Sequence, residues 1–405
     1  MKRAQDNMAF MQKIYFDYAA TAPTDPHVIE AMTPFLFEKF GNASSPHTIG
    51  REAQKALEES RETIARFIGA SADETIFNSG ATEGNNHVMS GLRSLRDKGH
   101  IIVSSIEHHS VLEPIELLRQ EGWSVTYLKV SADGLIDPQT VRMAITNKTA
   151  LIAVLHASNE IGTIQPIAEI GRIAQEHKIP FLVDAVQTIG HIPVNVNELN
   201  ADFISLSAHK FYGPKGVGVL YVGSGAAFSP LIFGGSQERG RRAGTENVPG
   251  IVGLGVASEL AQKNLPEESK RLRKLQTDFE SKIRSLVSGI TVSGGLAERL
   301  PNTSHLRFQG LESETLLIAL DQREVYASSG SACMSGSRQP SHVLKAMGCT
   351  DGEASSAVRF SFGRHTTEEE IHILVEELGR LVPRLRASEP AHSHSSEEIT
   401  KGAAF

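Results

Sequence analysis

Between Ala70 and Val222 the sequence alternates short apolar runs with amphipathic stretches long enough to form helices. Strands that alternate with helices build a mainly parallel sheet with crossover helices. The predicted fold class is therefore α/β: a large domain with a mainly parallel, seven-stranded-type sheet flanked by helices, and a smaller α+β domain. The apolar runs expected to be strands are residues 75–78, 100–105, 123–130, 150–156, 180–184, 203–206 and 217–222.

Composition narrows the class of protein further. The chain has 405 residues, is 40% hydrophobic and 21% charged, and is long enough for two domains. The net charge of -7 argues against nucleic acid or an anionic membrane as a partner. No apolar run is long enough to span a bilayer, and Met1 to Lys13 does not resemble a signal peptide. Two cysteines, Cys333 and Cys349, fit a reducing compartment, so we expect a cytoplasmic protein.

The later sequence suggests where the domains divide. We expect a large domain over residues 16–262 and a smaller domain from residues 1–15 and 263–388. Residues 389–405 are rich in polar residues and are expected to be disordered.

Three helices are predicted outside the alternating region. One is Pro26–Phe40, and the others are Val248–Ala261 and Glu267–Val287, on either side of the expected domain boundary.

A strand-like run at Phe203–Leu206 ends in Ser207, Ala208, His209 and Lys210. Polar groups at strand ends form the sites of α/β sheets. A lysine can form a Schiff base with an aldehyde, and serine and histidine can hold a phosphate. Pyridoxal 5'-phosphate (PLP) requires that combination. The alternative is an ordinary surface lysine after a strand.

Asp184 ends another apolar run, which begins at Pro180. A carboxylate there is suited to pair with a protonated pyridine nitrogen, whereas the alternative is a helix-capping aspartate. An acid at one strand end and Lys210 at the next favour the cofactor interpretation.

The segment Thr75–Asn86 reads as a strand, a glycine turn and the start of a helix. Free N–H groups at a helix start bind phosphate, and Thr82 adds a hydroxyl. The alternative is that Ser79 or Thr82 serves only as an N-cap.

His108 and His109 follow a predicted strand. Adjacent residues seldom converge on one metal ion, so we expect one of these rings to stack on the cofactor instead. Asn159, after the strand that ends at His156, could bond the cofactor or a substrate carboxylate, or could be a turn residue.

Cys333 lies in a run of small residues between Gly330 and Gly336. This composition predicts an exposed, mobile thiol that could attack a substrate sulfur and hold it as a persulfide. Cys349 is expected to be an ordinary buried cysteine.

Arg359 stands among apolar residues of a predicted strand. It could capture a substrate carboxylate in bidentate fashion or form an internal salt bridge. The arginine-rich stretch 233–247 could be a solvated loop, or a subunit contact that reaches a neighbour's phosphate.

Together these motifs resemble the group I cysteine desulfurases of the NifS/IscS type, in the class V aminotransferase superfamily of fold-type I PLP enzymes. The resemblance covers Tyr15 to Leu385. The motifs that carry it are Tyr15–Thr21, Gly41–Asn42, Ser79–Glu83, Glu107–His108, Asn159–Gly162, Asp184–Gln187, Ser207–Lys210, Gln237–Thr245, Ser328–Cys333 and Arg359–Ser361.

The resemblance implies roles around the cofactor ring. Lys210 would carry PLP and move the Cα proton, and Asp184 would pair with the pyridine nitrogen. Gln187 would bond the phenolic oxygen. His108 would stack on the ring and transfer protons, and Asn159 would also contact the cofactor.

It also implies roles for the phosphate and the substrate. Asn159 and Arg359 would orient the substrate carboxylate, and Cys333 would accept the sulfur. The residues that would hold the phosphate are Thr82, Ser207, His209 and, from a partner subunit, Thr245. Ala81 would also bind the cofactor.

The implied activity converts L-cysteine to L-alanine and a persulfide on Cys333. That sulfur would pass to an Fe–S scaffold or another acceptor, such as a tRNA-thiolation relay. We expect a homodimer with no resident metal, although Cys333 could serve as a transient Fe–S ligand.

Two departures from the family pattern affect the acceptor. Met334 replaces the threonine expected after the active cysteine, and the sequence after Ala387 does not match the segment that docks a scaffold in many members. The alternatives are another PLP reaction, such as that of a selenocysteine lyase, a kynureninase-like hydrolase or an aminotransferase, and a non-enzymatic assembly partner.

Overall fold

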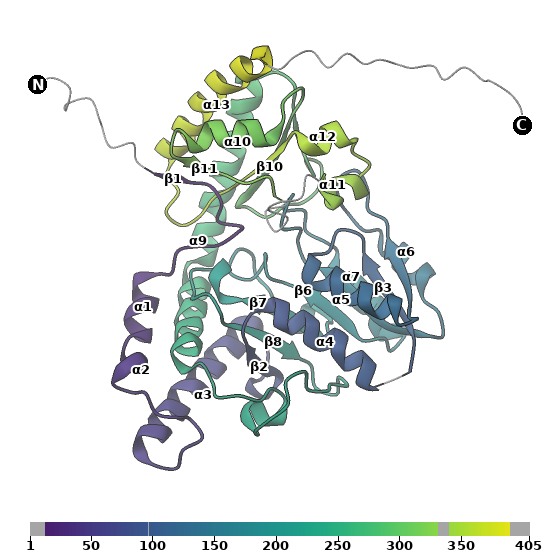
Figure 1. Ribbon diagram of the computed structural model, residues 1–405, viewed down its shortest axis with the longest axis vertical. Helices are drawn as coiled ribbons and strands as arrows, with labels where there is room; N and C mark the ends of the chain where they lie inside the picture. Colours follow the sequence, from purple (N-terminus) through teal and green to yellow (C-terminus); the bar gives the residue numbers. More distant parts are fainter. Residues whose placement is uncertain (1–12, 96, 331–339, 389–405) are drawn as a thin grey trace, which may run out of the picture.

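The computed structural model describes residues 13–95, 97–330 and 340–388 (Figure 1). Its largest sheet has seven strands in the order β2-β8-β7-β6-β5-β3-β4. The run from β4 to β7 in that order is parallel, and β8 is antiparallel to both of its neighbours. The predicted mainly parallel sheet is confirmed. The strands are β2 (Thr75–Asn78), β3 (His100–Ser104), β4 (Ser124–Leu128), β5 (Thr149–Leu155), β6 (Phe181–Asp184), β7 (Phe203–Ser207) and β8 (Gly218–Val222).

Helices cover both faces of this sheet. Successive side chains of a strand point to opposite faces: in β3, Ile101 and Val103 pack in one apolar cluster and Ile102 in another. Helices α4 and α5 contribute to the first cluster, and α3, α7 and α9 contribute to the second. Helix α3 (Thr48–Ile68) precedes β2, and α9 (Val248–Leu286) follows β8. The helices that connect successive strands of the sheet are α4 (Ala81–Leu95), α5 (His109–Gln120), α6 (Pro138–Ala144), α7 (Ile167–Glu176) and α8 (Val196–Leu199).

A smaller three-stranded antiparallel sheet has the order β12-β10-β9 and packs in its own apolar cluster with α10 and α13. A two-stranded parallel pair joins β1 to β11. The elements of these two sheets and of the helices on this side of the fold are β1 (Ile14–Tyr15), β9 (Ile290–Val292), β10 (Thr303–Phe308), β11 (Val325–Tyr326), β12 (Ala357–Ser361), α10 (Ser313–Asp321) and α13 (Glu368–Ser388). Two short helices, α11 (His342–Ala346) and α12 (Asp351–Ser355), lie between β11 and β12 in the sequence.

The prediction of two helices around residue 262 is wrong, because one helix, α9 (Val248–Leu286), runs through 39 residues. Its first half buries Leu254 and Ala257 in the large-sheet cluster, and its second half buries Leu275 and Phe279 in the small-sheet cluster. Pro266 lies inside it at an exposed position. Burial at both ends thus sustains the helix through a residue that cannot donate its backbone hydrogen bond.

The predicted helix Pro26–Phe40 is also divided, into α1 (Pro26–Met32) and α2 (Pro34–Phe37). Pro34 accounts for the break, since it has no N–H to donate to the carbonyl of Glu30, four residues earlier. In the described part of the chain, no helix is both long enough and apolar enough to cross a membrane.

A buried ion pair fixes the arginine-rich loop against the large sheet. Arg61 of α3 donates from Nη1 and Nη2 to the two carboxylate oxygens of Glu238, at 2.8 and 2.7 Å. Glu238 also accepts the backbone N–H of Phe77 at 2.9 Å, and Arg61 donates to the carbonyl of Thr75 at 3.0 Å. Both side chains are less than 5% exposed. The 3₁₀ turn η3 (Gln237–Gly240) is therefore held to β2 through charged groups.

We predict strong energetic coupling between these two residues. Arg61→Met alone leaves the buried Glu238 without its charged partner, and Glu238→Leu leaves Arg61 with the partly exposed Glu58 at 3.3 Å. Each should cost up to about 3–5 kcal/mol of unfolding free energy. The double variant should lose much less than the sum of the two. Guanidinium denaturation of all four proteins measures the coupling. The same cycle on the exposed pair Arg93 and Glu121 should give at most about 1 kcal/mol; equal coupling in both cycles would contradict the prediction.

Candidate active site

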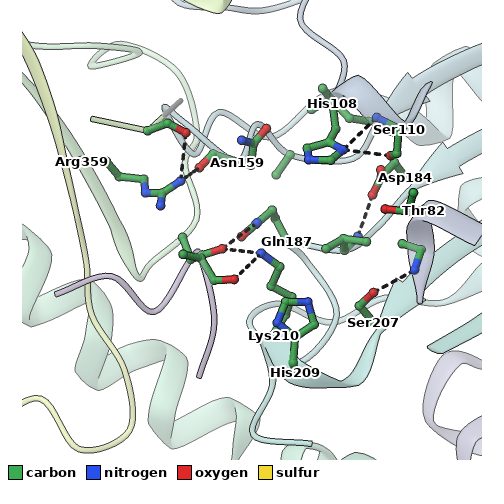
Figure 2. A pocket seen from close by; sticks show the side chains of 17 residues that line it. Thr82, His108, Ser110, Asn159, Asp184, Gln187, Ser207, His209, Lys210 and Arg359 are labelled. Atoms are coloured by element: carbon green, nitrogen blue, oxygen red, sulfur yellow. Dashed lines mark hydrogen bonds between the residues drawn. The ribbon is translucent and has the colours of Figure 1, made fainter. Parts of the chain in front are cut away.

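A cavity of about 310 Å³ lies at the carboxyl ends of β5, β6 and β7. The start of α4, the N-terminal segment and Arg359 of β12 complete its wall (Figure 2). Its lining includes ten of the twelve residues that the sequence analysis singled out for the site: Ala81, Thr82, His108, Asn159, Asp184, Gln187, Ser207, His209, Lys210 and Arg359.

Lys210 ends the 3₁₀ turn η2 (Ala208–Lys210), which directly follows β7. Its Nζ donates to the carbonyl oxygens of Ala19 and Ala20, at 2.6 and 2.9 Å. The N-terminal segment therefore sets the position of the lysine amine at the cavity wall.

Asp184 is the last residue of β6, and its side chain is buried. One carboxylate oxygen accepts the N–H of Val186 at 3.1 Å, and the other accepts Nδ2 of Asn85 at 2.9 Å. Donors on both oxygens hold the carboxylate in one orientation at the edge of the cavity. The sequence analysis did not identify Asn85, which α4 places under the cavity.

His108 is the N-cap of α5, and its Nδ1 accepts the N–H of Ser110 at 3.1 Å. The hydroxyl of Ser110 lies 2.9 Å from the same nitrogen. Burial lowers the pKa of His108, although the nearby Asp184 opposes that shift. The ring is thus a neutral imidazole at the cavity wall, and Figure 2 shows its bonds to Ser110.

The start of α4 forms one end of the cavity. Ser207 Oγ accepts the N–H of Ala81 at 2.9 Å, and Thr82 adds its hydroxyl. Gly80 has a φ of +142°, which a residue with a side chain would rarely adopt. Burial lowers the pKa of His209 to about 4, so this imidazole is neutral and can offer a hydrogen bond. Helix N–H groups, hydroxyls and an imidazole together suit a phosphate.

Gln187 and Asn159 lie on other parts of the wall. Gln187 donates from Nε2 to the carbonyl of Ala19 at 3.1 Å, the oxygen that also accepts Lys210. One amide hydrogen of Gln187 remains for a cofactor or substrate oxygen. The side chain of Asn159 lines the cavity, and its backbone carbonyl accepts Arg359 Nη1 at 2.6 Å.

Arg359 forms the internal salt bridge that the sequence allowed as one of two interpretations. It also lines the cavity, and its Nη2 donates to the partly buried Asp17 at 2.6 Å. The guanidinium has five donors, and its Nε is buried with no hydrogen-bond partner in the described residues. Asp17 was not identified from the sequence, because only the fold brings it to a residue 342 positions away.

Two expected site residues are not found in this cavity. Thr245 lines a neighbouring cavity together with Ser79 and Arg242, and Cys333 lies outside the described residues. Cys349 is partly buried in the smaller part of the fold, where its sulfur accepts Nη1 of Arg307 at 3.2 Å. Among the residues with described positions, no cluster of histidine, cysteine and acidic side chains could hold a metal ion.

The residues present fit PLP. The cavity offers a lysine amine, an oriented carboxylate for a ring nitrogen, and neutral donors beside a helix start for a phosphate. The alanine and valine side chains of Ala19, Ala157 and Val186 supply apolar surface for a planar ring.

Comparison with known proteins agrees with this site. Residues 14–374 match the sequence model of the class-V aminotransferase family. Cysteine desulfurase IscS of Dictyoglomus turgidum is 49% identical over 381 residues, which cover 94% of this chain and 97% of that protein.

Solved structures show the same similarity. A NifS-like protein superimposes with a TM-score of 0.87 at 37% identity, covering 92% of this chain and all of that one. The structure titled "SspA in complex with cysteine" has a TM-score of 0.78 at 40% identity, with 87% and 100% of the two chains covered.

The chain belongs to the class-V aminotransferase family. The resemblance to cysteine desulfurases of the NifS/IscS type is confirmed, and so is PLP as the cofactor on which these enzymes depend.

Two buried histidines beside the site predict a loss of stability in mild acid. Burial lowers the pKa of His156 to about 4 and that of His305 to about 3. The unfolded chain, with a histidine pKa of about 6.5, then binds protons that the folded protein does not. Their contribution to stability is complete above pH 6.5 and is lost as the pH falls toward the folded pKa values.

Between pH 7 and pH 5 the unfolding free energy should fall by on the order of 1–2 kcal/mol for each of these histidines. Urea unfolding at a series of pH values measures this slope. His305→Asn should make it shallower, whereas replacement of the exposed His177 should not. An unchanged slope in His305→Asn would contradict the assignment.

Proposed function

We propose that this chain is a PLP-dependent cysteine desulfurase that converts L-cysteine to L-alanine and leaves a persulfide on Cys333. The observation that carries the proposal is the single cavity that brings Lys210, Asp184 and Arg359 together from separate elements. The similarity to cysteine desulfurases over 94% of the chain supports it.

In this proposal Lys210 would hold PLP through its amine, and the Asp184 carboxylate would accept a hydrogen bond from the protonated pyridine nitrogen. Gln187 donates to the phenolic oxygen. The cofactor, when bound, supplies an electron sink that makes the substrate Cα proton acidic. The residues that hold the phosphate are Ala81, Thr82, Ser207 and His209.

The substrate carboxylate is oriented by Arg359, whose position is fixed by Asp17 and the Asn159 carbonyl. The Asn159 side chain provides a further polar contact. Lys210 then removes the proton at Cα and returns it to the product. His108, neutral in its buried position, can accept or donate a proton at its second ring nitrogen.

Cys333 is three residues beyond Gly330, which lines the cavity. Its thiolate attacks the substrate sulfur, so the S–S bond forms as the Cβ–S bond breaks. The electron pair of the broken bond stays on Cβ, which takes up a proton. The products are L-alanine and a Cys333 persulfide, and the atoms and electrons balance.

Replacement of Cys333 by serine should keep the visible absorbance of the lysine-bound cofactor and lower sulfide release from L-cysteine by at least about 100-fold. Lys210→Ala should remove both the absorbance and the activity. Sulfide and alanine are measured together in the presence of a thiol reductant. Undiminished release by Cys333→Ser would overturn the persulfide role. A cofactor spectrum without either product, in the unmodified protein, would favour another PLP reaction.

We also propose a homodimer. Several large apolar side chains lie at the surface of the chain: Leu36, Phe37 and Phe40 are 61–67% exposed, and Phe233 is 78% exposed. A second copy of the chain would cover such a surface. In this dimer Thr245 would reach the phosphate of the partner, since within its own chain it lines the neighbouring cavity.

Mixed dimers test where Thr245 acts. Thr245→Ala should weaken PLP binding by about 10-fold, because a hydrogen bond to a charged group is lost. A dimer of one Thr245→Ala chain and one Lys210→Ala chain should contain one fully intact site, which takes Lys210 from the first chain and Thr245 from the second. Cofactor titration and sulfide release per dimer measure it. No recovery in the mixed dimer would place Thr245 in its own chain's site.

Three further expectations accompany this function. The sulfur would pass to an acceptor protein such as an Fe–S scaffold. Residues 16–262 would form a PLP-binding domain and residues 1–15 and 263–388 a smaller one, supported by the two separate apolar clusters that α9 joins. A cytoplasmic location is supported by the low cysteine content.

A further inference from the structure

Asn85 of α4 connects two groups of the site that the sequence places far apart. It is fully buried. Its Nδ2 lies 2.9 Å from Asp184 Oδ2 and 2.9 Å from Ser110 Oγ. An amide nitrogen has two hydrogens, so both are used, one toward the carboxylate and one toward the hydroxyl.

These contacts set the direction of every hydrogen in the chain of bonds. Asp184, as a carboxylate, only accepts, so the amide nitrogen and not the amide oxygen of Asn85 must face it. Ser110 Oγ receives the second amide hydrogen, and its own hydrogen is then available for His108 Nδ1 at 2.9 Å. The backbone N–H of Ser110 donates to the same nitrogen at 3.1 Å.

His108 Nδ1 therefore faces two donors and has no place for a proton of its own. The ring proton of the neutral imidazole must lie on Nε2, because the bonds at one ring nitrogen decide the tautomer. The charged and titratable groups around this ring are Asp184, Lys210, His109 and His342.

Burying the amide oxygen of Asn85 lowers the stability of the fold, which argues against a purely structural role for this residue. Its Oδ1 is buried with no hydrogen-bond partner among the described residues. An unsatisfied buried acceptor is destabilising, and leucine, of similar size, would avoid that loss. The two hydrogen bonds that its Nδ2 donates, to Asp184 and to Ser110, therefore explain why an asparagine occupies this position.

We propose that Asn85 is a positioning residue: through Ser110 it fixes His108 as the Nε2–H tautomer, and directly it orients the Asp184 carboxylate. One amide thereby sets the hydrogen-bonding state of both the acid and the imidazole. The assignment of roles to Asp184 and His108 rests on the proposed function, but the tautomer does not.

The tautomer can be measured in the cofactor-free protein by NMR of ¹⁵N-labelled histidine, with the His108 signals assigned by their loss in His108→Gln. The unmodified protein should show the Nε2–H pattern for this residue. Asn85→Leu and Ser110→Ala should each raise the share of the Nδ1–H tautomer, because the backbone N–H of Ser110 is then the one fixed donor that remains at Nδ1 among these contacts. Ser110→Thr keeps a hydroxyl and should restore the original pattern.

Asn86→Leu is the matched control, because Asn86 is the next residue of the same helix and its amide donates to the Thr82 carbonyl at 2.8 Å. It should leave the His108 signals unchanged. The Nε2–H pattern retained in both Asn85→Leu and Ser110→Ala would overturn the proposal. Should Asn85→Leu fail to fold, Ser110→Ala with its Ser110→Thr counterpart decides the question.

A second readout separates this inference from the proposed function. In the loaded enzyme, Asn85→Leu should shift the pH profile of sulfide release while Asn86→Leu leaves it in place. If the chain releases no sulfide at all, the proposed function fails, yet the tautomer measurement still tests Asn85.

Discussion

The buried guanidinium of Arg359 is the constraint on which the site geometry depends. A buried charge is stable only when it is paired and hydrogen-bonded. Arg359 meets that condition by drawing together three segments: Asp17 near the N-terminus, the Asn159 carbonyl after β5, and its own strand β12. The N-terminal segment is then held where the carbonyls of Ala19 and Ala20 accept the Lys210 amine. The smaller sheet thus positions the lysine on the larger one.

The polar groups in the cavity follow a common electrostatic pattern. Burial disfavours charge, and it lowers the pKa values of His108 and His209, so both rings remain neutral. Asp184 instead receives a hydrogen bond on each oxygen, and these two bonds hold its carboxylate in one orientation. The site therefore presents one oriented carboxylate, one amine and neutral donors, with the guanidinium of Arg359 in another part of the wall. A cofactor with a protonated ring nitrogen and a phosphate requires that distribution of charge.

The sequence predicted what depends on local pattern. The alternation of runs predicted the sheet, and the polar residues Asp184 and Ser207–Lys210 marked the strand ends that form the cavity. The sequence did not predict features that depend on contacts between residues far apart in the chain. Nothing near Pro266 shows that both ends of α9 are anchored in different cores, and nothing near Asp17 shows that Arg359 lies beside it.

The same limit explains why the sequence predicted a role for Thr82 but none for Asn85, three residues further along the helix. A hydroxyl at a helix start is recognisable, because the free N–H groups around it belong to the same few residues. Asn85 reaches Asp184 only because α4 packs closely on the sheet. Gly84, which has no side chain, leaves room there for Ser205 of β7. A Cβ at Gly84 would lie 2.9 Å from that hydroxyl and would push the helix away. The hydrogen-bond relay therefore depends on a close helix–sheet approach that no local motif records.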